Sequence, residues 1–381
     1  MAEALVLAAM AVCRRMREKS DDCLRGVQSV AQRLKVTGRR QKFNETNDRK
    51  ASDLGRNAMS RIVHGIAVAA VTVLSVTVTA AFAQNVKITP LGSHDGEFCR
   101  FDRAMVFEDP DGTRILYDAG RTVAGAGDPR LGDIDAILVS HVHGDHVGDR
   151  RIPAVNAGEC GNPDVSVATT PNSNSVDIML AKNAKLIMGS EMPGFFANKV
   201  KALGGDASSV QLVRFGASRK IGGVAVTTVP AVHSNGLGGA FIEGELGEHL
   251  STAGLTAYVG PPTGYVLSFT NGLVAYLSGD TGVTAEQETV VRRQYGAQLV
   301  VMNIGDTFTT GPTEAAFVIN ELIKPGSVIA SHANELATEG GKVIAGTKTE
   351  TFMKAAKVPV HLPLSGKTME FDGNGKCAAG C

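Results

Sequence analysis

Residues 134–150 constrain the fold more than any other part of the chain. Their sequence is IDAILVSHVHGDHVGDR, in which an apolar run of strand length leads directly into three histidines and an aspartate. A short continuous apolar run predicts a strand buried in a parallel sheet. In α/β folds, binding and catalytic sites form at the carboxyl ends of such strands. The sequence therefore predicts an α/β protein with a functional site at this strand end.

The polar side chains of this segment are suited to binding a divalent metal ion. His141 and His143 can point the same way from an extended backbone. Asp145 and His146 follow Gly144, which permits a turn, so they can face a second centre. Imidazole and carboxylate ligands without a thiolate favour Zn²⁺ or a similar ion, and an open position makes such a site catalytic. Histidine-rich tracts also occur by chance, but ligand spacing at a strand end favours the metal site.

Three later strand ends supply further candidate ligands. His233 follows the strand predicted in GGVAVTTVPAVHSNG, and His332 ends the short strand in SVIASHANE. Asp280 ends the second strand of a hairpin that the Asn-Gly dipeptide at 271–272 predicts. A lone histidine is more often structural and a lone aspartate can cap a turn, so each position is weak evidence by itself.

Taken together, these motifs resemble the metallo-β-lactamase superfamily. SHVHGDH matches its HxHxDH signature, and the later segments are similar to the UlaG-like, ascorbate-phosphate lactonase-like branch of metal-dependent hydrolases. The resemblance rests on five separated motifs in the family's order and covers residues 86–364. It implies a four-layer αββα sandwich with one or two metal ions at the edges of the sheets.

The resemblance also implies a role for each candidate residue. It implies one metal held by His141, His143 and His233, and a second held by Asp145, His146 and His332. Asp280 would bridge them, because a carboxylate can contact two cations through its two oxygens. Asp118 ends the strand predicted in TRILYDAG and would support a metal-binding histidine. A role in capping the following turn is equally compatible with the sequence around Asp118.

The chain departs from the UlaG-like pattern in a loop expected to face the site. Where that branch resembles GGHFTMGP, this chain has GDTFTTGP, so Thr307 replaces the histidine and Asp306 lies beside it. The departure puts the family's substrate in doubt for this chain. Asn334 follows the last candidate ligand by two residues and is a candidate substrate contact, although a plain turn role fits equally well.

These residues predict a metal-dependent hydrolase that uses a metal-bound hydroxide. Two metal ions would lower the pKa of a shared water towards ~7 and polarise the electrophile of a lactone, ester, amide or phosphodiester. Asp280 and Asp145 are the candidate catalytic carboxylates, and Asp145 can act as a proton shuttle if one metal is bound. Two zinc ions are the expected cofactor, with manganese or iron as alternatives.

Other functions remain open at this stage. The same ligands could serve hydrolytic dehalogenation, or could hold iron in an oxidoreductase. The sequence lacks a flavodoxin-like domain and rubredoxin cysteines, which disfavours a diiron electron-transfer protein. A non-catalytic metal-binding module is disfavoured because every ligand position is filled.

The first 83 residues differ in composition from the remainder. Residues 1–58 carry 13 Lys or Arg against 7 Asp or Glu, which predicts a disordered or weakly helical basic extension. Residues 59–83 combine Arg61, an apolar stretch and an Ala-x-Ala motif, which predicts a signal peptide cleaved before Gln84. If Met59 is the initiator, the extension is not translated. Cleavage would release a periplasmic or secreted hydrolase domain over 84–381. The alternative is that residues 62–82 stay uncleaved and anchor this domain in the membrane.

Charge and cysteine content narrow the expected partners. From Gln84 onward the chain carries 24 basic and 31 acidic residues, a net charge of −7, and it has no tryptophan. An acidic domain without tryptophan lacks the positive surface and the stacking side chains that nucleic-acid binding requires, so no nucleic-acid partner is expected. The expected partner is a small-molecule substrate, and a homo-oligomer is compatible with the sequence. No stable membrane partner is expected once the signal peptide is cleaved. Export would leave four cysteines, for which we predict the pairs Cys99–Cys160 and Cys377–Cys381 among three possible arrangements.

Two long segments rich in glycine, at 151–174 and 235–262, are expected to wall the site as loops. His249 in the second segment is expected to be solvated, and His361 is expected to be structural. Helices are predicted at 175–182, 193–203 and 284–294, and from Thr313 to a stop at Pro325.

Overall fold

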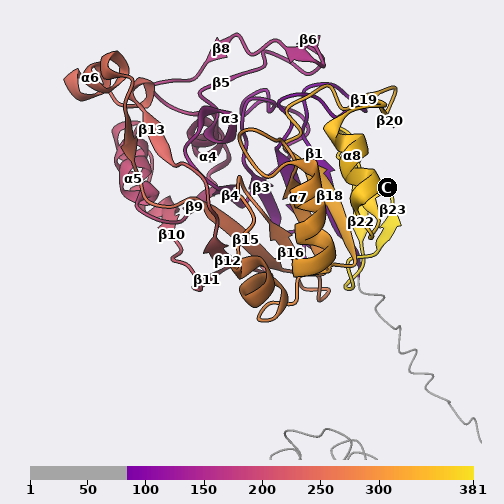
Figure 1. Ribbon diagram of the computed structural model, residues 1–381. Coiled ribbons are helices and arrows are strands. Elements are labelled where there is room, and N and C mark those ends of the chain that lie inside the picture. The colour runs from indigo at the N-terminus through magenta and orange to yellow at the C-terminus, as the bar shows by residue number, and fades with distance from the viewer. Residues whose placement is uncertain (1–83) are drawn as a thin grey trace, which may run out of the picture. The chain divides into compact units, whose positions relative to one another are not determined.

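Two mixed β-sheets lie face to face in the computed structural model, and helices cover both outer faces (Figure 1). The structure describes residues 84–381, so the predicted basic extension and signal peptide lie outside the described residues. Within residues 84–381 no helix is both long and apolar enough to span a bilayer. The order of layers is helix, sheet, sheet, helix, which confirms the predicted αββα sandwich.

The first sheet contains the strand that precedes the histidine-rich segment. Its spatial order is β10-β9-β4-β3-β2-β1-β22-β23. β1 to β3 form an antiparallel meander, and β3, β4, β9 and β10 are parallel. All four residues of β4 are buried, as their continuous apolar run predicts. The strand bounds are β1 Val86–Pro90, β2 Met105–Glu108, β3 Arg114–Tyr117, β4 Ala136–Val139, β9 Lys185–Met188, β10 Val210–Leu212, β22 Met369–Phe371 and β23 Cys377–Ala379.

The second sheet carries the remaining strand ends. Its order is β11-β12-β15-β16-β17-β18-β21, with β15 and β16 forming the predicted hairpin. β16, β17, β18 and β21 are parallel, so their carboxyl ends lie at one edge. The strand bounds are β11 Ser218–Ile221, β12 Val224–Pro230, β15 Thr263–Ser268, β16 Val274–Leu277, β17 Leu299–Asn303, β18 Ser327–Ser331 and β21 Val360–His361.

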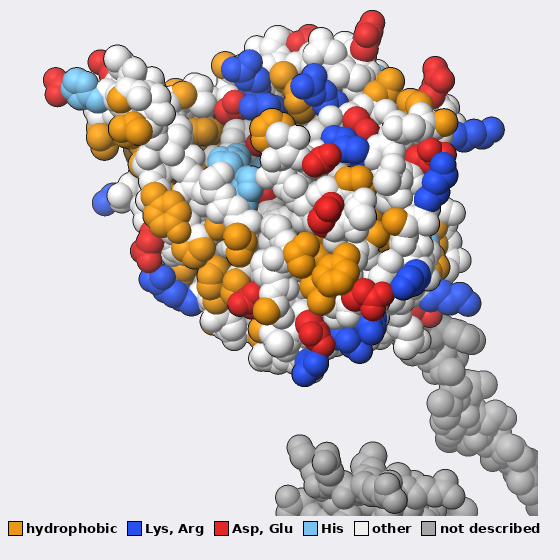
Figure 2. Space-filling model, in the orientation of Figure 1, with side chains coloured by type: hydrophobic (Ala, Val, Ile, Leu, Met, Phe, Trp, Pro, Cys, Tyr) orange, Lys and Arg blue, Asp and Glu red, His pale blue; other side chains and the backbone are white. Residues whose placement is uncertain are grey.

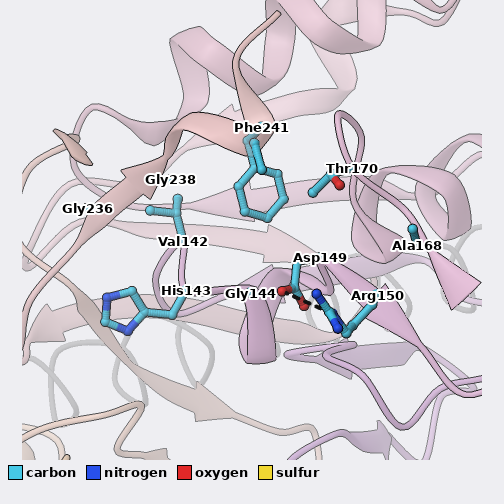
Figure 3. Close-up of a pocket in the computed structure, with 11 residues that line it drawn as sticks. Val142, His143, Gly144, Asp149, Arg150, Ala168, Thr170, Gly236, Gly238 and Phe241 are labelled. Atoms are coloured by element: carbon cyan, nitrogen blue, oxygen red, sulfur yellow. Dashed lines mark ion pairs between the residues drawn. The ribbon is translucent and has the colours of Figure 1, made fainter. Parts of the chain in front are cut away.

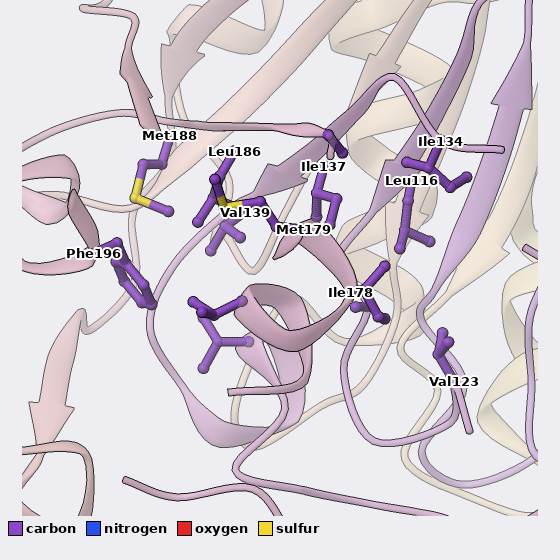
Figure 4. Packing of buried hydrophobic residues seen from close by; sticks show 14 of the residues in the cluster. Leu116, Val123, Ile134, Ile137, Val139, Ile178, Met179, Leu186, Met188 and Phe196 are labelled. Carbon is purple, nitrogen blue, oxygen red and sulfur yellow. The ribbon is translucent and has the colours of Figure 1, made fainter. Parts of the chain in front are cut away.

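Three layers of apolar packing hold the sandwich together. Side chains from the inner faces of both sheets, such as Phe107 and Leu267, form the central core. Figure 4 shows the outer face of the first sheet, where Ile178 and Phe196 of two helices pack against Val139 and neighbouring strand residues. A third cluster covers the outer face of the second sheet. The helices involved are α4 Asn174–Lys182, α5 Met192–Ala202, α7 Pro312–Phe317, α8 Lys348–Ala355 and the π-helices η4 Gln287–Arg292 and η5 Val318–Ile323.

The predicted helices are present with shifted or altered bounds. The helix predicted at 284–294 is the shorter π-helix η4, and the one predicted from Thr313 begins at Pro312 and continues as η5. η5 ends at Ile323, and its C-cap residue Lys324, with a left-handed φ of 54°, comes immediately before Pro325. An apolar stripe does not distinguish an α-helix from a π-helix, so the sequence could not predict the change of pitch.

The two segments predicted as loops differ in their structure. Residues 151–174 form short ladders, β5 Arg150–Arg151 with β8 Val167–Ala168 and β6 Gly158–Glu159 with β7 Asn162–Pro163. The prediction that 235–262 is irregular was wrong. That segment contains β13 Gly236–Gly238, the 3₁₀ turn η3 Gly239–Phe241, α6 Glu245–Ala253 and β14 Thr256–Tyr258.

Helix α6 was missed because its flanking glycines read as loop residues. Gly244 and Gly254 both have positive φ and lie at the N-cap and C-cap of the helix. The remaining short elements are α3 Gly144–Val147, η2 Ala207–Ser209, β19 Thr338–Glu339 and β20 Lys342–Val343.

Both predicted disulfides are present. Cys99–Cys160 ties the 151–174 segment to the stretch before β2, and Cys377–Cys381 closes a short loop at the last strand. The first disulfide therefore fixes a wall segment against residues that lie beside the candidate site.

Candidate metal centre

The polar ends of four strands meet at one edge of the sandwich. His141 and His143 follow β4, and α3 then carries Asp145 and His146. The second sheet adds one residue after each of β12, β16 and β18. Figure 2 shows histidine side chains at the floor of a hollow on this face. The structure thus brings together all seven predicted ligands, namely His141, His143, Asp145, His146, His233, Asp280 and His332.

Three imidazoles form one half of this cluster, which we call the three-histidine half. Nδ1 of His143 lies 3.0 Å from Nε2 of His141 and 3.3 Å from Nε2 of His233. Burial and the neighbouring imidazoles of His146 and His233 lower the pKa of His143 to about 4. Burial also lowers the pKa values of His141 and His233. These rings are therefore neutral at pH 7, with lone pairs that a cation can take.

Asp145, His146 and His332 form the other half, which we call the carboxylate half. Oδ2 of Asp145 lies 3.7 Å from Nε2 of His146 and 3.5 Å from Nε2 of His332. Burial opposes ionisation of Asp145, but the positive charges of Arg103 and His146 outweigh it and hold the pKa of that carboxyl well below its usual range. The carboxylate half thus contains a charged ligand, whereas the three-histidine half is made of neutral groups.

Asp280 lies between the two halves. Its Oδ2 is 3.1 Å from Nε2 of His332 and 3.4 Å from Nε2 of His146. The same oxygen is 3.9 Å from Nε2 of His141 and 3.7 Å from Nε2 of His233. Burial would raise the pKa of this carboxyl, but His332 and His146 hold it well below its usual range. A buried carboxylate surrounded by four imidazoles is placed to contact cations on both sides.

Unpartnered buried atoms test whether a metal fits. Within residues 84–381, Nε2 of His146 and Oδ1 of Asp280 are buried and have no hydrogen-bond partner. A buried polar atom without a partner costs about 1–3 kcal/mol. Burial disfavours charge on His146, yet the carboxylates of Asp280, Asp145 and Asp118 raise its pKa to about 10. Such a field attracts positive charge, so a divalent cation fits these residues.

Asp118 supports the cluster from behind. Its Oδ2 accepts hydrogen bonds from Nδ1 of His146 at 2.8 Å and from Oγ of Ser140 at 2.7 Å. Its Oδ1 accepts from the backbone N–H of Ser140 at 2.8 Å. The contact fixes the ring of His146 so that Nε2 faces the cluster. Of the two roles that the sequence allowed for Asp118, the geometry matches support of a histidine. Ser140, whose Oγ also lies 3.0 Å from Nδ1 of His141, was missed.

The backbone at the strand ends departs from ordinary geometry. Asp118 has a φ of 42° and His332 a φ of 52°. A left-handed conformation costs a residue with a β-carbon about 1–2 kcal/mol, and such positions cluster at functional sites. Gly144, in contrast, has no positive φ and begins helix α3, so the expected glycine turn is absent. A Cβ there would lie 2.4 Å from Cγ of Asp149, so glycine is needed for close packing.

Arg103 is the principal site residue that sequence reasoning missed. Its side chain is 4% exposed, and its Nη2 lies 2.5 Å from Oδ2 of Asp145 and 2.8 Å from Nε2 of His332. Nη2 also donates to Oδ1 of Asn334 at 3.0 Å. In the sequence Arg103 is only a charged residue just before an apolar strand. Nothing in that pattern indicates that its side chain contacts residues more than two hundred positions away.

Comparison with known proteins identifies the family. The profile described as "Beta-lactamase superfamily domain" matches residues 113–333. The chain belongs to the metallo-β-lactamase superfamily. It is 31% identical over 225 residues to a UPF0173 metal-dependent hydrolase of Methanopyrus kandleri, an alignment that covers 58% of this chain and 77% of the relative. Identity to the UPF0173 metal-dependent hydrolase of Koribacter versatilis is 25% over 236 residues, covering 61% and 82%.

Within the superfamily, this chain is a metal-dependent hydrolase of the UPF0173 family, which is UlaG-like. A metallo hydrolase of known structure from Ignicoccus hospitalis aligns with 18% identity and a TM-score of 0.46, covering 76% of this chain and 99% of that chain. YhfI of Bacillus subtilis, a metallo-β-lactamase fold protein, aligns with 14% identity and a TM-score of 0.46, covering 75% and 99%.

The hydrolase centre opens into a cavity of about 410 Å³. Asp145, Asp280 and His332 lie on its wall, and the candidate substrate contacts Thr307 and Asn334 also line it. Thr307 is exposed, whereas Asn334 is half-buried and contacts Arg103. The lining includes further basic side chains, among them Arg100 and Lys348.

A second hollow of about 390 Å³ shares His143 with the main cavity (Figure 3). Ala168 and Thr170 of the 151–174 segment line it together with Gly238 and Phe241 of the 235–262 segment. Both inserted segments therefore wall a space beside the cluster, as the sequence predicted. His249 is exposed on α6, and His361 packs its ring 5.4 Å from that of Phe371, outside the cluster.

Proposed function

We propose that this chain is a binuclear metallohydrolase that cleaves a small lactone, ester, amide or phosphodiester. The observation that carries the proposal is the position of Asp280, whose Oδ2 lies within 3.9 Å of imidazole nitrogens from both halves of the cluster. A single carboxylate in that position is suited to joining two cations. Membership of a metal-dependent hydrolase family supports the same reaction class.

The proposed ligands divide as the geometry does. His141, His143 and His233 would hold one ion, the carboxylate half would hold the other, and Asp280 would contact both. When bound, the ions lower the pKa of a water molecule and polarise the electrophilic carbonyl or phosphoryl group of the substrate. Three imidazoles and few carboxylates favour zinc, while manganese and iron remain chemically compatible.

The chain's own residues supply orientation and proton transfer. Asp145 is held ionised by Arg103 and His146 and has a side chain 23% exposed to the cavity, so it can accept a proton and pass it to a leaving group. Asp118 keeps His146 in one orientation through its 2.8 Å hydrogen bond. The side chain of Asn334 lines the cavity and is available to orient a polar substrate group.

The cavity wall favours a substrate that carries negative charge. Among the ion pairs of residues 84–381, neither Arg100 nor Lys348 has an acidic partner, although both line the cavity. Nζ of Lys348 donates to the backbone oxygen of Gly305 at 2.7 Å. These two cations can pair with a carboxylate or phosphate on the substrate. Thr307, in place of the branch's histidine, changes the same wall.

Elemental analysis and a hydrolysis panel test the proposal. The full chain is purified, metals are quantified per chain, and turnover is measured with a chromogenic lactone, a β-lactam, a phosphodiester and an aryl halide. We expect up to two zinc or manganese ions and turnover of one of the first three substrates. Turnover of the aryl halide alone would support hydrolytic dehalogenation instead. Iron without hydrolysis would favour the oxidoreductase, and absence of both metal and turnover after reconstitution would refute the proposal.

We also propose that the hydrolase domain is exported after cleavage before Gln84. Support comes from the Ala-x-Ala motif at 81–83 and from two disulfides in the domain, since disulfides persist in oxidising compartments. N-terminal sequencing of the protein from native cells tests this. A mature start at Gln84 is expected, whereas a retained segment over 62–82 in the membrane fraction would support the anchored form.

A further inference from the structure

We infer that Arg103 competes with the second metal ion for the carboxylate half, so that the two halves of the centre bind metal with unequal affinity and fill in order. The inference rests on the proposed function only in taking the seven clustered residues as metal ligands. It concerns a residue that lies outside that set and that carries a fixed positive charge.

Arg103 contacts two of the proposed ligand atoms directly. Its Nη2 lies 2.8 Å from Nε2 of His332 and 2.5 Å from Oδ2 of Asp145. These are the same two atoms that converge with Nε2 of His146 to form the carboxylate half. The arginine therefore contacts the ligand atoms themselves and not their outer sides.

The contact with His332 uses the same lone pair that a metal ion would need. A guanidinium nitrogen has only hydrogens to offer, so it can bond to Nε2 of His332 only through the lone pair of that nitrogen, which also lies 3.1 Å from Oδ2 of Asp280. A neutral imidazole has a single lone pair, which cannot be given to an N–H and to a metal together. Metal binding to His332 through Nε2 thus requires Nη2 of Arg103 to move away. Oδ2 of Asp145 would lose the same partner in the same movement.

Burial and the anchored backbone around it fix the position of Arg103. Its side chain is 4% exposed, and the preceding residue, Asp102, accepts hydrogen bonds from the backbone N–H groups of Ser93 and Cys99 at 2.9 and 2.8 Å. The Cys99–Cys160 disulfide anchors the same stretch. Displacement of the guanidinium therefore works against a fixed backbone.

Hydrogen bonds to protein groups outside the site do not account for the burial of the Arg103 side chain. Within residues 84–381, Nε and Nη1 of Arg103 are buried without hydrogen-bond partners. Among the three guanidinium nitrogens only Nη2 has polar partners, and these are Asp145, His332 and Asn334 of the site. The attraction of the carboxylate half for positive charge is the interaction that keeps this arginine buried.

The three-histidine half has no such competitor. Among the hydrogen bonds and ion pairs of the part of the chain that the structure describes, those made by the side chains of His141, His143 and His233 involve only one another, two serines and Asp280. The first ion can enter this half without displacing a cation. The second ion meets a resident positive charge, and at low metal concentration Arg103 takes the place of that ion beside Asp145.

A metal titration of the full chain tests this inference. The metal-free protein is titrated with Zn²⁺ by calorimetry in the presence of a competing chelator, and two dissociation constants are fitted. For the wild type we expect the first Kd to be at least about tenfold lower than the second, within the usual range of electrostatic coupling between sites. Arg103→Met keeps an unbranched apolar stem and removes the guanidinium with all its donors, so it should lower the second Kd by about tenfold and leave the first nearly unchanged.

A matched variant controls for the general charge of the cavity. Arg100→Met removes a cation from the same cavity wall, and Arg100 makes no ion pair with the proposed ligands. We expect both of its dissociation constants to stay close to those of the wild type. Arg103→Lys keeps the charge but loses the planar fork, and an intermediate second Kd is expected.

The outcomes separate this inference from the proposed function. Two ions bound with equal affinity by the wild type overturn the inference and leave the binuclear hydrolase intact. A second Kd that Arg103→Met leaves unchanged or raises also overturns it, because Arg103 would then support the ligands. No zinc binding at all refutes the proposed function itself. If Arg103→Met fails to fold by circular dichroism, Arg103→Lys carries the test, and a second Kd equal to that of the wild type overturns the inference.

Discussion

The two halves of the metal centre are built from the same kind of strand end, yet their electrostatics differ. The three-histidine half presents neutral rings whose pKa values are lowered by burial and by the neighbouring imidazole of His146. The carboxylate half contains an ionised aspartate, a histidine backed by Asp118, and the guanidinium of Arg103. A ligand set read from spacing alone leaves out these neighbouring charges, on which, by our inference, the metal affinity of each half depends.

The largest expected effect comes from the residue that joins the halves. Asp280→Ala removes the carboxylate shared by both, so we expect kcat/KM to fall by at least about 10³-fold, beyond the 10–100-fold loss typical of residues that only support ligands. The fold should persist, because Asp280 lies at a strand end and not in an apolar cluster. Steady-state kinetics with metal-loaded protein and a thermal melt measure the two properties.

Asp306→Ala provides the matched control for that variant. Asp306 is an exposed carboxylate in the same cavity and contacts none of the proposed ligands. Its kcat/KM should stay within a few-fold of the wild type. If metal-loaded Asp280→Ala keeps its activity, Asp280 is not a metal ligand, and the two halves are not joined through it.

Substitution of one histidine in each half should give different metal contents. His233→Ala weakens the half that lacks a competing cation, so we expect the tightly held ion to be lost on dialysis. His332→Ala affects only the half that Arg103 already occupies, so one ion should be retained. Elemental analysis after dialysis against a weak chelator measures both. Loss of all metal from His332→Ala with retention in His233→Ala would reverse the order that we assign.

Asp118→Asn should have a smaller effect that is confined to the carboxylate half. The amide keeps the shape but removes the charge that holds Nδ1 of His146, so the affinity for the second ion should fall by about 10–100-fold. Zinc titration followed by calorimetry gives the two constants separately. Asp128→Asn, which alters a buried aspartate paired with Arg130 instead, is the control and should leave both constants unchanged. An equal loss at both halves would show that Asp118 acts on the whole fold.

The smallest expected effect concerns the hollow beside the three-histidine half. A Cβ on Gly238 would meet no atom within 4 Å, and its φ of −67° suits any residue, so Gly238→Val should fill the hollow without strain. We expect KM to rise several-fold for long p-nitrophenyl esters and to stay constant for the acetate, since only the long chains need this space. Gly127→Val, also in open space, is the control. Equal effects on short and long esters would show that this hollow holds no part of the substrate.

Much of this site could be predicted from sequence because its ligands follow strands. An apolar run fixes a buried strand, the strand fixes where its carboxyl end lies, and His141, His233 and His332 each follow such a run. Thr307, expected at the site from the resemblance to the UlaG-like loop, and Asn334, two residues after His332, both line the cavity. Both disulfides also agreed with the prediction.

The residues that were missed have their partners far away in sequence. Arg103 reaches His332 across 229 positions, and no local pattern records that contact. Ser140 looked like part of an apolar strand, and its role depends on the three-dimensional approach of Asp118. Helix α6 and the π-helices depended on cap geometry and helix pitch, which composition does not encode.

We expect two metal ions, one on either side of Asp280. Anomalous diffraction at the zinc edge, from crystals of the full chain at one equivalent and then at excess zinc, tests this arrangement most directly. We expect one peak among His141, His143 and His233 at one equivalent. At excess zinc we expect a second peak about 3.5–4 Å away beside Asp145 and His332, with Arg103 displaced. A single peak at every zinc concentration, or peaks that do not contact Asp280, would contradict the account.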